Sequence, residues 1–244
     1  MNDRLSGKRA VVTGGTRGLG RAIADAFAAE GAHVVCAGRT DPAGHPDWPR
    51  EFTYLPVDVT DADSVEEMMS RAADTLGGID IVVANAGVSI DGRVHRTTAA
   101  DWATTMAVNV NGVFHTTRSA IPHLEKTGGT IINVSSSMAT RVAVGAAAYC
   151  ASKAAVEMFT KVSAAELGSR NITVNCLAPG ILDGGIADDL AQNPKAWELY
   201  RDRLIAKRVG RVAEAAAGAV FLASGDSSYV NGHVLEVNGG LLWA

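Results

Sequence analysis

Two side chains that can exchange a proton lie four positions apart in the run YCASK at residues 149–153. This run opens a stretch whose apolar residues recur at helical spacing, and positions i and i+4 of a helix project from one face. A lysine ammonium stabilises a nearby phenolate and so lowers the phenol pKa, which is ordinarily about 10. We therefore interpret Tyr149 and Lys153 as a candidate acid/base pair. A solvated surface pair with the same spacing is the alternative.

A glycine-rich segment, TGGTRGLG at residues 13–20, leads from an expected strand at 10–13 into an expected helix. Glycines let the backbone turn sharply and approach a pyrophosphate, which the free N–H groups and dipole of a helix N-terminus attract. The spacing is G-x-x-x-G-x-G rather than the usual dinucleotide fingerprint G-x-G-x-x-G. The strand-loop-helix context still predicts a nucleotide phosphate site, with a purely structural turn as the alternative.

The end of the second expected strand, residues 33–37, bears on the choice of cofactor. NAD-binding units usually place an acidic residue there to hold the ribose 2′-hydroxyl, whereas an arginine accommodates the 2′-phosphate of NADP. This chain has Gly38 and Arg39, and Arg17 in the glycine loop supplies a second cation that can pair with phosphate. The pattern favours NADP(H). NAD(H), or two arginines that are merely solvated, are the alternatives.

Strands and helices alternate along the rest of the chain, which predicts an α/β fold with a parallel sheet. The expected strands cover residues 10–13, 33–37, 52–57, 79–84, 130–134, 172–177 and 234–237. Helices are expected from residue 22, over 65–76 and 100–124, from 149, and over 212–224. Prolines within residues 41–51 forbid a regular helix there, so we expect a long loop in place of the crossover helix.

Polar residues lie at two further places where the pattern predicts a ligand. The segment 135–137 is three serines that follow the fifth strand, and open α/β sheets bind ligands at the carboxyl ends of their strands. Asn109 falls on or beside the apolar stripe of the helix expected over 100–124. An unpaired buried amide costs about 1 to 3 kcal/mol. Asn109 is therefore either a satisfied structural amide or part of a site.

The composition excludes several classes of protein. A formal net charge of −4 argues against a general binder of nucleic acids or anionic membranes, and no apolar stretch approaches the roughly 18 residues of a membrane span. Three cysteines at wide spacings favour reduced thiols in a cytoplasmic protein without a metal site. The first residues are polar, so no signal peptide is expected. We expect one domain over residues 1–244, with the polar, amphipathic segment 184–209 as a substrate lid.

With these residues placed, the sequence resembles the short-chain dehydrogenase/reductase family, in its compact single-domain branch. The resemblance rests on TGGTRGLG at 13–20, Asp58, NAG at 85–87, Asn109, Ser136, YCASK at 149–153, PG at 179–180 and VNGG at 237–240. It implies a Rossmann-type doubly wound parallel sheet of about seven strands in the order 3-2-1-4-5-6-7, with helices on both faces. It also implies a homotetramer or homodimer, assembled through the helices of Asn109 and Tyr149 and through the last strand.

The resemblance implies catalytic roles for four residues. Tyr149 would be the general acid in carbonyl reduction, and Lys153 would lower its pKa and bind the nicotinamide ribose. Ser136 would hydrogen-bond the substrate oxygen. Asn109 would hold a water molecule that relays protons toward Lys153.

The implied cofactor site involves the ends of five expected strands, the first four and the sixth. Asp58 would contact the adenine, and Asn85 would support the cofactor edge. The family usually has a threonine four residues beyond the glycine of the PG pair; this chain has Gly184, so the carboxamide would be held differently. The full set is Gly14, Thr16, Arg17, Gly18, Leu19, Gly20, Arg39, Asp58, Val59, Asn85, Ala86, Gly87, Tyr149, Lys153, Pro179, Gly180 and Ile181.

The implied activity is hydride transfer between NADP(H) and a carbonyl or secondary alcohol, by a carbonyl or ketoacyl reductase. An NAD(H)-dependent alcohol dehydrogenase and a non-catalytic dinucleotide sensor are the alternatives. The substrate itself stays open. The segment between Ser136 and Tyr149 is mostly small and apolar, with Ala139, Val142, Ala143, Val144 and Gly145. The expected lid contains Trp197 and Tyr200, so a partly apolar small-molecule carbonyl compound fits.

Overall fold

The computed structural model describes residues 3–42, 44, 47–49, 51–183, 197–198 and 201–242 of the 244-residue chain. Seven parallel strands in this part form one sheet in the order β3-β2-β1-β4-β5-β6-β7, which confirms the predicted topology. All of them therefore end at the same edge. The strands are β1 (Arg9–Thr13), β2 (His33–Gly38), β3 (Thr53–Pro56), β4 (Ile81–Ala84), β5 (Gly129–Val134), β6 (Ile172–Pro179) and β7 (Val234–Val237).

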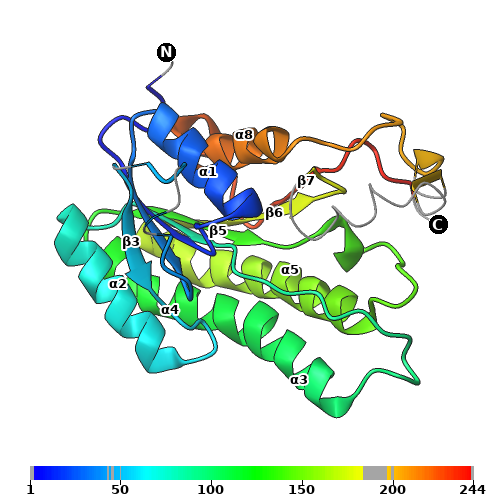
Figure 1. The fold of residues 1–244 in the computed structure, drawn as a ribbon. Coiled ribbons are helices and arrows are strands. Elements are labelled where there is room, and N and C mark those ends of the chain that lie inside the picture. The colour runs from blue at the N-terminus through cyan, green and yellow to red at the C-terminus, as the bar shows by residue number, and fades with distance from the viewer. Residues whose placement is uncertain are drawn as a thin grey trace.

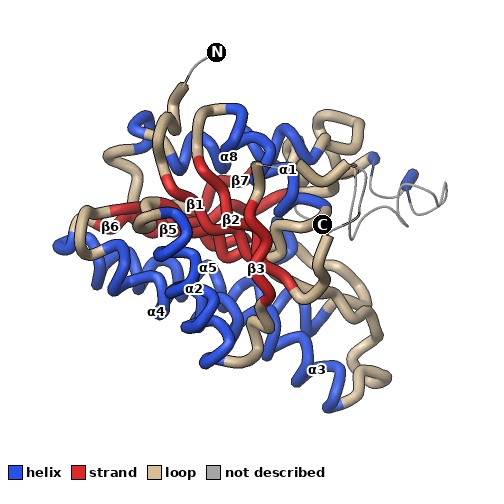
Figure 2. The backbone as a smooth tube through the Cα atoms, turned by 60° about the vertical axis from the view of Figure 1, so that its left-hand side comes forward, coloured by secondary structure: helices blue, strands red, loops and turns tan. Residues whose placement is uncertain are grey.

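Helices cover both faces of this sheet, as Figures 1 and 2 show. The first face packs against α1 (Gly18–Ala29) and α8 (Val212–Ala223), and the second against α2 (Ala62–Leu76), α4 (Gly112–Leu124) and α5 (Ala147–Leu167). Successive strand residues point to opposite faces: Val12 belongs to the first core and Val11 to the second. This is why the central strands read as continuous apolar runs.

The loop between β2 and β3 contains no helix in its described residues, as its prolines predict. Trp48 anchors it through an edge-to-face contact with Phe52, with ring centroids 5.7 Å apart. The guanidinium of Arg21, on α1, lies 5.2 Å from the centroid of the Trp48 ring and donates a hydrogen bond of 2.8 Å to the carbonyl of Asp47. The loop is therefore fixed to α1 by cation–π and hydrogen-bond contacts.

The single helix predicted over residues 100–124 is wrong in its interior. The structure has α3 (Ala99–Met106) and α4, joined by a π-helical turn at Ala107–Asn111. The N–H group of Gly112 bonds to the carbonyl of Ala107, five residues earlier, so one residue is inserted into the helical winding. Such turns are frequent at functional sites. Here the turn buries Asn109 completely.

The expected lid over 184–209 lies mostly outside the described residues, and Gly184 and Tyr200 are among those outside. Its last part is described and lies against the C-terminal residues. Ile205 N–H donates to the carbonyl of Gly240 at 3.2 Å, and Ala206 N–H donates to that of Gly239 at 2.9 Å. Within the described part of the chain, every helix is too short or too polar to cross a membrane.

Candidate active site

The predicted site residues follow the ends of neighbouring strands, and the register brings those ends together. Thr13 pairs with Ala84, Ala84 with Asn133, and Asn133 with Cys176 across β1, β4, β5 and β6. The glycine loop, the NAG segment, the serines and the PG pair thus share one edge of the sheet. Tyr149 and Lys153 reach it from α5.

The glycine loop needs glycine because the segment after β4 packs directly against it. Gly14 has a φ of +65°, and a Cβ there would lie 2.8 Å from Asn85 Nδ2 and 3.0 Å from Ala86 Cα. The Asn85 amide donates hydrogen bonds to the carbonyls of Thr13 at 2.9 Å and Gly14 at 3.3 Å. Thr13 Oγ1 in turn accepts from the Asn85 N–H at 3.1 Å. Asn85 therefore shapes the loop through its own side chain.

The loop leads into the N-terminus of α1, where phosphate is expected to bind. Gly18 begins the helix, no acidic side chain lies in its first turn, and Leu19 and Gly20 continue it. Free N–H groups and the helix dipole favour an anion at this position. Thr16 lies beside the end of β2, since a Cβ on Gly38 would be 3.5 Å from its Oγ1. The glycine loop and the second strand end are therefore in contact.

Charged side chains surround the ends of β2 and β3. Arg17 and Arg39 are exposed at the ends of adjacent strands. Asp58 accepts hydrogen bonds from Thr60 N–H at 2.9 Å and Thr60 Oγ1 at 2.7 Å; these bonds, and then the charge of Arg39, lower the Asp58 pKa. Val59 is buried beside it. A cavity of about 300 Å³ at this corner is lined by Arg39, Pro56, Val57, Asp58, Ser64, Glu67, Met68 and Arg71.

Tyr149 and Lys153 lie on one face of α5, with the Lys153 Nζ 5.6 Å from the centroid of the Tyr149 ring. Lys153 is 3% exposed, and burial lowers its pKa to about 8. Its Nζ donates a hydrogen bond of 2.8 Å to the carbonyl of Val134 at the end of β5. Lys153 is thus a buried cation that loses its proton more readily than an exposed lysine does.

The electrostatics of Tyr149 differ from the sequence prediction. Lys153 was expected to lower the phenol pKa, whereas the structure shows a raised pKa because burial of the phenol outweighs the opposing effect of the Ser136 hydroxyl. The lysine ammonium is directed to the Val134 carbonyl and is itself destabilised by burial. In the protein alone, the phenol is therefore protonated at neutral pH.

The three serines after β5 differ in their side-chain hydrogen bonds, and the buried Ser137 Oγ has no partner among the described residues. Ser136 is the N-cap of the short 3-10 turn η2 (Ser137–Ala139), and its Oγ accepts the Met138 N–H at 3.2 Å. Ser135 Oγ donates to the carbonyl of Lys153 at 3.0 Å and lies 3.2 Å from Glu157 Oε1, so it ties the strand to α5. Of the three serines, Ser136 is the one whose hydroxyl affects the pKa of Tyr149, which it lowers. Ser136 is therefore the serine placed for the chemistry.

Asn109 joins the segment after β4 to α5. Its Nδ2 donates to the Val88 carbonyl at 2.9 Å and to Ser152 Oγ at 3.0 Å, while its Oδ1 accepts the Val88 N–H at 2.9 Å. Ser152 Oγ donates to the carbonyl of Tyr149 at 2.7 Å. Both amide hydrogens of Asn109 are thus used within the protein. Ser152 is not among the residues predicted for the site; its signal in the sequence is a hydroxyl next to the lysine in YCASK.

Gly87 marks the place where Asn109 and Lys153 approach each other. A Cβ at Gly87 would lie 3.3 Å from Asn109 Oδ1 and 3.6 Å from Lys153 Nζ. A carbonyl oxygen has two lone pairs, so Oδ1 keeps one beyond its bond to Val88. The Asn109 side chain thus ties two segments together through its amide and also places a hydrogen-bond acceptor, Oδ1, near Lys153 Nζ.

The PG pair lies where β6 meets the C-terminal residues. Gly180 N–H donates to the carbonyl of Val237 at 2.9 Å, and a Cβ on Gly180 would lie 2.6 Å from Asn238 Cα. Glycine is therefore required after Pro179. Ile181 is buried against Leu204 and Leu241.

Comparisons with known proteins show similarity over nearly the whole chain. A family model described as enoyl-(acyl carrier protein) reductase matches residues 14–242. Nodulation protein G of Rhizobium sp. (strain N33) is 38% identical, with 97% of this chain and 98% of that protein covered. A 3-oxoacyl-[acyl-carrier-protein] reductase of Thermotoga maritima is 37% identical, with 98% and 99% covered.

The solved structures include one with a bound cofactor. A gluconate 5-dehydrogenase from Burkholderia cenocepacia J2315, crystallised with NADP and tartrate, superposes with a TM-score of 0.92 at 32% identity. The superposition covers 98% of this chain and 97% of that chain. The likeness therefore extends over the whole sheet and its helices.

Proposed function

The chain belongs to the short-chain dehydrogenase/reductase family, and from this premise we propose that it is an NADP(H)-dependent carbonyl reductase in which Tyr149 is the general acid. One observation carries the proposal: Tyr149, Lys153 and Ser136 meet at the sheet edge that also carries the glycine loop. As a member of this family it is an oxidoreductase acting on carbonyl or alcohol groups with a nicotinamide cofactor.

The residues at the edge fit a dinucleotide. Gly14 has no room for a Cβ against Asn85, and the N-terminus of α1 next to it suits a pyrophosphate. We assign the phosphates to this loop, the adenine to Asp58 and Val59, and the ribose of the nicotinamide to Lys153. The bound cofactor supplies the hydride.

The chain's own groups act on the carbonyl oxygen. Ser136 Oγ donates a hydrogen bond to this oxygen, and the Tyr149 hydroxyl gives it a proton as negative charge develops there. Because burial raises the pKa of Tyr149, the phenol carries its proton at neutral pH and is ready for reduction. The reverse reaction needs Tyr149 as a phenolate, which accepts the proton of the alcohol.

We assign NADP(H) rather than NAD(H) because Arg17 and Arg39 are exposed at adjacent strand ends and no acidic side chain follows β2 directly. The similar gluconate 5-dehydrogenase structure contains NADP, which supports this choice. The substrate is a partly apolar carbonyl compound, bound near the small apolar residues between Ser136 and Tyr149. The name of the Thermotoga relative supports a 3-oxoacyl compound.

The proposal is tested with a panel of ketones, 3-oxoesters and 3-oxoacyl thioesters, with NADPH or NADH oxidation as the readout. Reduction of at least one compound, with a higher kcat/KM for NADPH, is the expected result. Failure with every carbonyl compound, in a protein that binds NADPH, would contradict it.

We further propose a single-domain homotetramer in the cytoplasm. Large apolar side chains are exposed along the helices that carry the site: Trp102 on α3 (43% exposed), Phe114 on α4 (44%), and Met158 (60%) and Val162 (49%) on α5. An apolar surface of this kind is typical of an interface between subunits. Light scattering after size exclusion gives the mass, and a monomer at micromolar concentration would contradict this assignment.

A further inference from the structure

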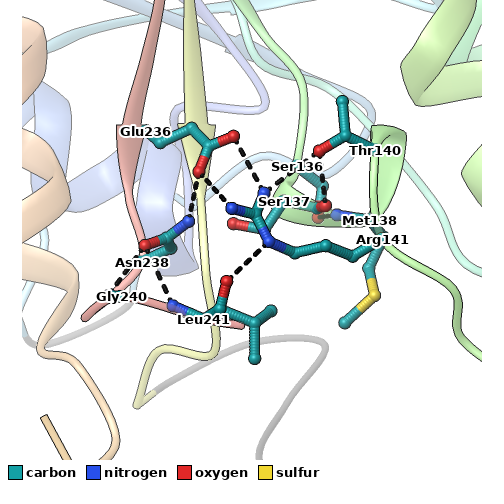
Figure 3. Close-up of polar contacts among 9 residues, drawn as sticks. All are labelled: Ser136, Ser137, Met138, Thr140, Arg141, Glu236, Asn238, Gly240 and Leu241. Atoms are coloured by element: carbon teal, nitrogen blue, oxygen red, sulfur yellow. Dashed lines mark hydrogen bonds and ion pairs between the residues drawn. The ribbon is translucent and has the colours of Figure 1, made fainter. Parts of the chain in front are cut away.

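Arg141 lies five residues after Ser136 and makes contacts that the activity described above does not explain (Figure 3). Its Nε donates to the carbonyl of Leu241 at 2.7 Å. Its terminal nitrogens bind both carboxylate oxygens of Glu236, on β7, at 2.8 and 2.7 Å. The Arg141 side chain is only 10% exposed. A forked, largely buried guanidinium fixes its partners in direction as well as in distance.

The partners of Arg141 form a compact turn at the C-terminal end of β7. Asn238 Nδ2 donates to Glu236 Oε2 at 2.5 Å, and its Oδ1 accepts the N–H groups of Gly240 at 2.9 Å and Leu241 at 3.3 Å. Figure 3 shows Arg141 bound to both ends of this turn, which we call the C-terminal turn (residues 236–241). The turn is held by side chains from within, so it offers Arg141 a rigid support.

The C-terminal turn also contacts the substrate side of the site. Leu241 packs with Ile181, and Met138 of η2 packs against the same small cluster. The bonds from Ile205 and Ala206 to the turn attach the last part of the expected lid to it. Arg141 thus connects the segment of Ser136 with both the end of β6 and residues 203–206.

The backbone between Ser136 and Arg141 is held in a tight turn by its own hydrogen bonds. Ala139 N–H donates to the Ser136 carbonyl at 2.9 Å, Arg141 N–H donates to the Ser137 carbonyl at 3.2 Å, and Ser136 Oγ accepts from Met138. A displacement at Arg141 is therefore transmitted through one tight turn to Ser136.

We propose that Arg141 is a positioning residue: by clamping the segment 136–141 to the C-terminal turn, it holds the Ser136 hydroxyl where the substrate carbonyl oxygen binds. The inference rests on the proposed function, because it gives Ser136 that partner. A misplacement of about 1 Å in an active site can cost about 100-fold in rate. Loss of the clamp should lower turnover and leave binding of the cofactor unchanged.

The test is a double-mutant cycle with Arg141→Met, Ser136→Ala and the double variant, using ethyl acetoacetate and NADPH. Arg141→Met should lower kcat/KM about 10- to 100-fold in the parent. The same change should cost less than about threefold in the Ser136→Ala background, because Arg141 acts through that hydroxyl. The Kd of NADPH should stay within about threefold of the parent value. Arg141→Lys keeps a charge but not the fork, so its activity should be intermediate.

Arg9→Met is the matched control. Arg9 binds Asp80 through Nε at 2.8 Å, is also partly buried, and lies at the opposite edge of the sheet. It should lower stability without changing kcat/KM. Equal losses from Arg141→Met in the two backgrounds, or an equal loss in Arg9→Met, would overturn the inference.

Amide hydrogen exchange separates this inference from the proposed function. Peptides covering 135–148 and 203–206 should exchange faster in Arg141→Met and at the parent rate in Arg9→Met. If the parent reduces no carbonyl compound, the proposed function fails, and the exchange result still decides on the clamp. Unchanged exchange in Arg141→Met would refute the clamp whatever the activity.

Discussion

Replacing Lys153 with methionine should make the protein more stable at neutral pH while abolishing turnover. Methionine fills similar space on α5 without a charge. Lys153 is 3% exposed, and burial lowers the pKa of its ammonium from the ordinary value of 10.5 to about 8. A site that keeps such a cation buried for catalysis does so at a cost in stability.

The structure sets the size of this effect. Each tenfold change in proton affinity corresponds to about 1.4 kcal/mol, so the charged Lys153 destabilises the folded state by about 3 kcal/mol at pH 7. The variant leaves the Val134 carbonyl without its donor, which costs about 1 to 3 kcal/mol. The net gain at pH 7 is therefore between about 0 and 2 kcal/mol.

The change of this stability difference with pH is a stricter test than its value at pH 7. Between about pH 8 and 10.5 the unfolded lysine binds a proton that the folded lysine has lost, so parent stability gains from this group as pH rises. The penalty falls from about 3 kcal/mol at pH 7 to about 1 kcal/mol at pH 10. The advantage of Lys153→Met over the parent should shrink by about 2 kcal/mol across this range.

Urea unfolding of parent and variant from pH 7 to 10 measures this difference. Lys161→Met, an exposed lysine on the same helix, is the control and should follow the parent at every pH. A stability difference between Lys153→Met and the parent that does not change with pH would refute the reasoning, since no buried ammonium would then be titrating.

Three other substitutions test the site. Tyr149→Phe should abolish turnover with the Kd of NADPH nearly intact, and turnover within about tenfold of the parent would exclude Tyr149 as the general acid. Arg39→Asp should shift the ratio of kcat/KM values from NADPH toward NADH; a parent that already prefers NADH would disprove the roles of Arg17 and Arg39. Asn109→Ala removes the tie between Val88 and Ser152 and should cost about 2 to 4 kcal/mol in urea unfolding, whereas a cost below about 0.5 kcal/mol would show that the tie is not formed.

The sequence predicted the central strands and the edge that carries the site because its signals are local, whereas the order of the strands was implied by the resemblance to the family. An apolar run marks each central strand, and the residue after the run must lie at the carboxyl edge. The glycine loop could be predicted for the same reason. The residues that form its turn, including Gly14 with a φ of +65°, and those that begin the next helix lie within a few positions of each other. The prediction of a phosphate site did not depend on the glycine spacing, which differs from the usual fingerprint. It depended on the order of strand, loop and helix around the glycines.

The features that the sequence could not predict depend on partners far away in the chain. The π-turn at Ala107–Asn111 shifts the apolar pattern by only one position, which periodicity over 100–124 does not detect. The direction of the Tyr149 pKa depends on how deeply the phenol is buried, which its spacing from Lys153 does not reveal. Arg141 reads as a polar loop residue until β7 brings Glu236 beside it.

The two side chains proposed to act on the substrate carbonyl are held by separate sets of hydrogen bonds. Tyr149 is fixed through Ser152 and Asn109 to the segment after β4, and Ser136 is fixed through Arg141 to the C-terminal turn. The two sets of bonds share no residue. Both lead to the face of α5 that carries the Tyr149 phenol, one through Ser152 and the other through Ser136. Proton donation needs the phenol and the serine hydroxyl at one oxygen, within hydrogen-bond distance of it. Local sequence places Tyr149 and Ser136 at the sheet edge, and hydrogen bonds between distant segments fix the position of each side chain relative to the other.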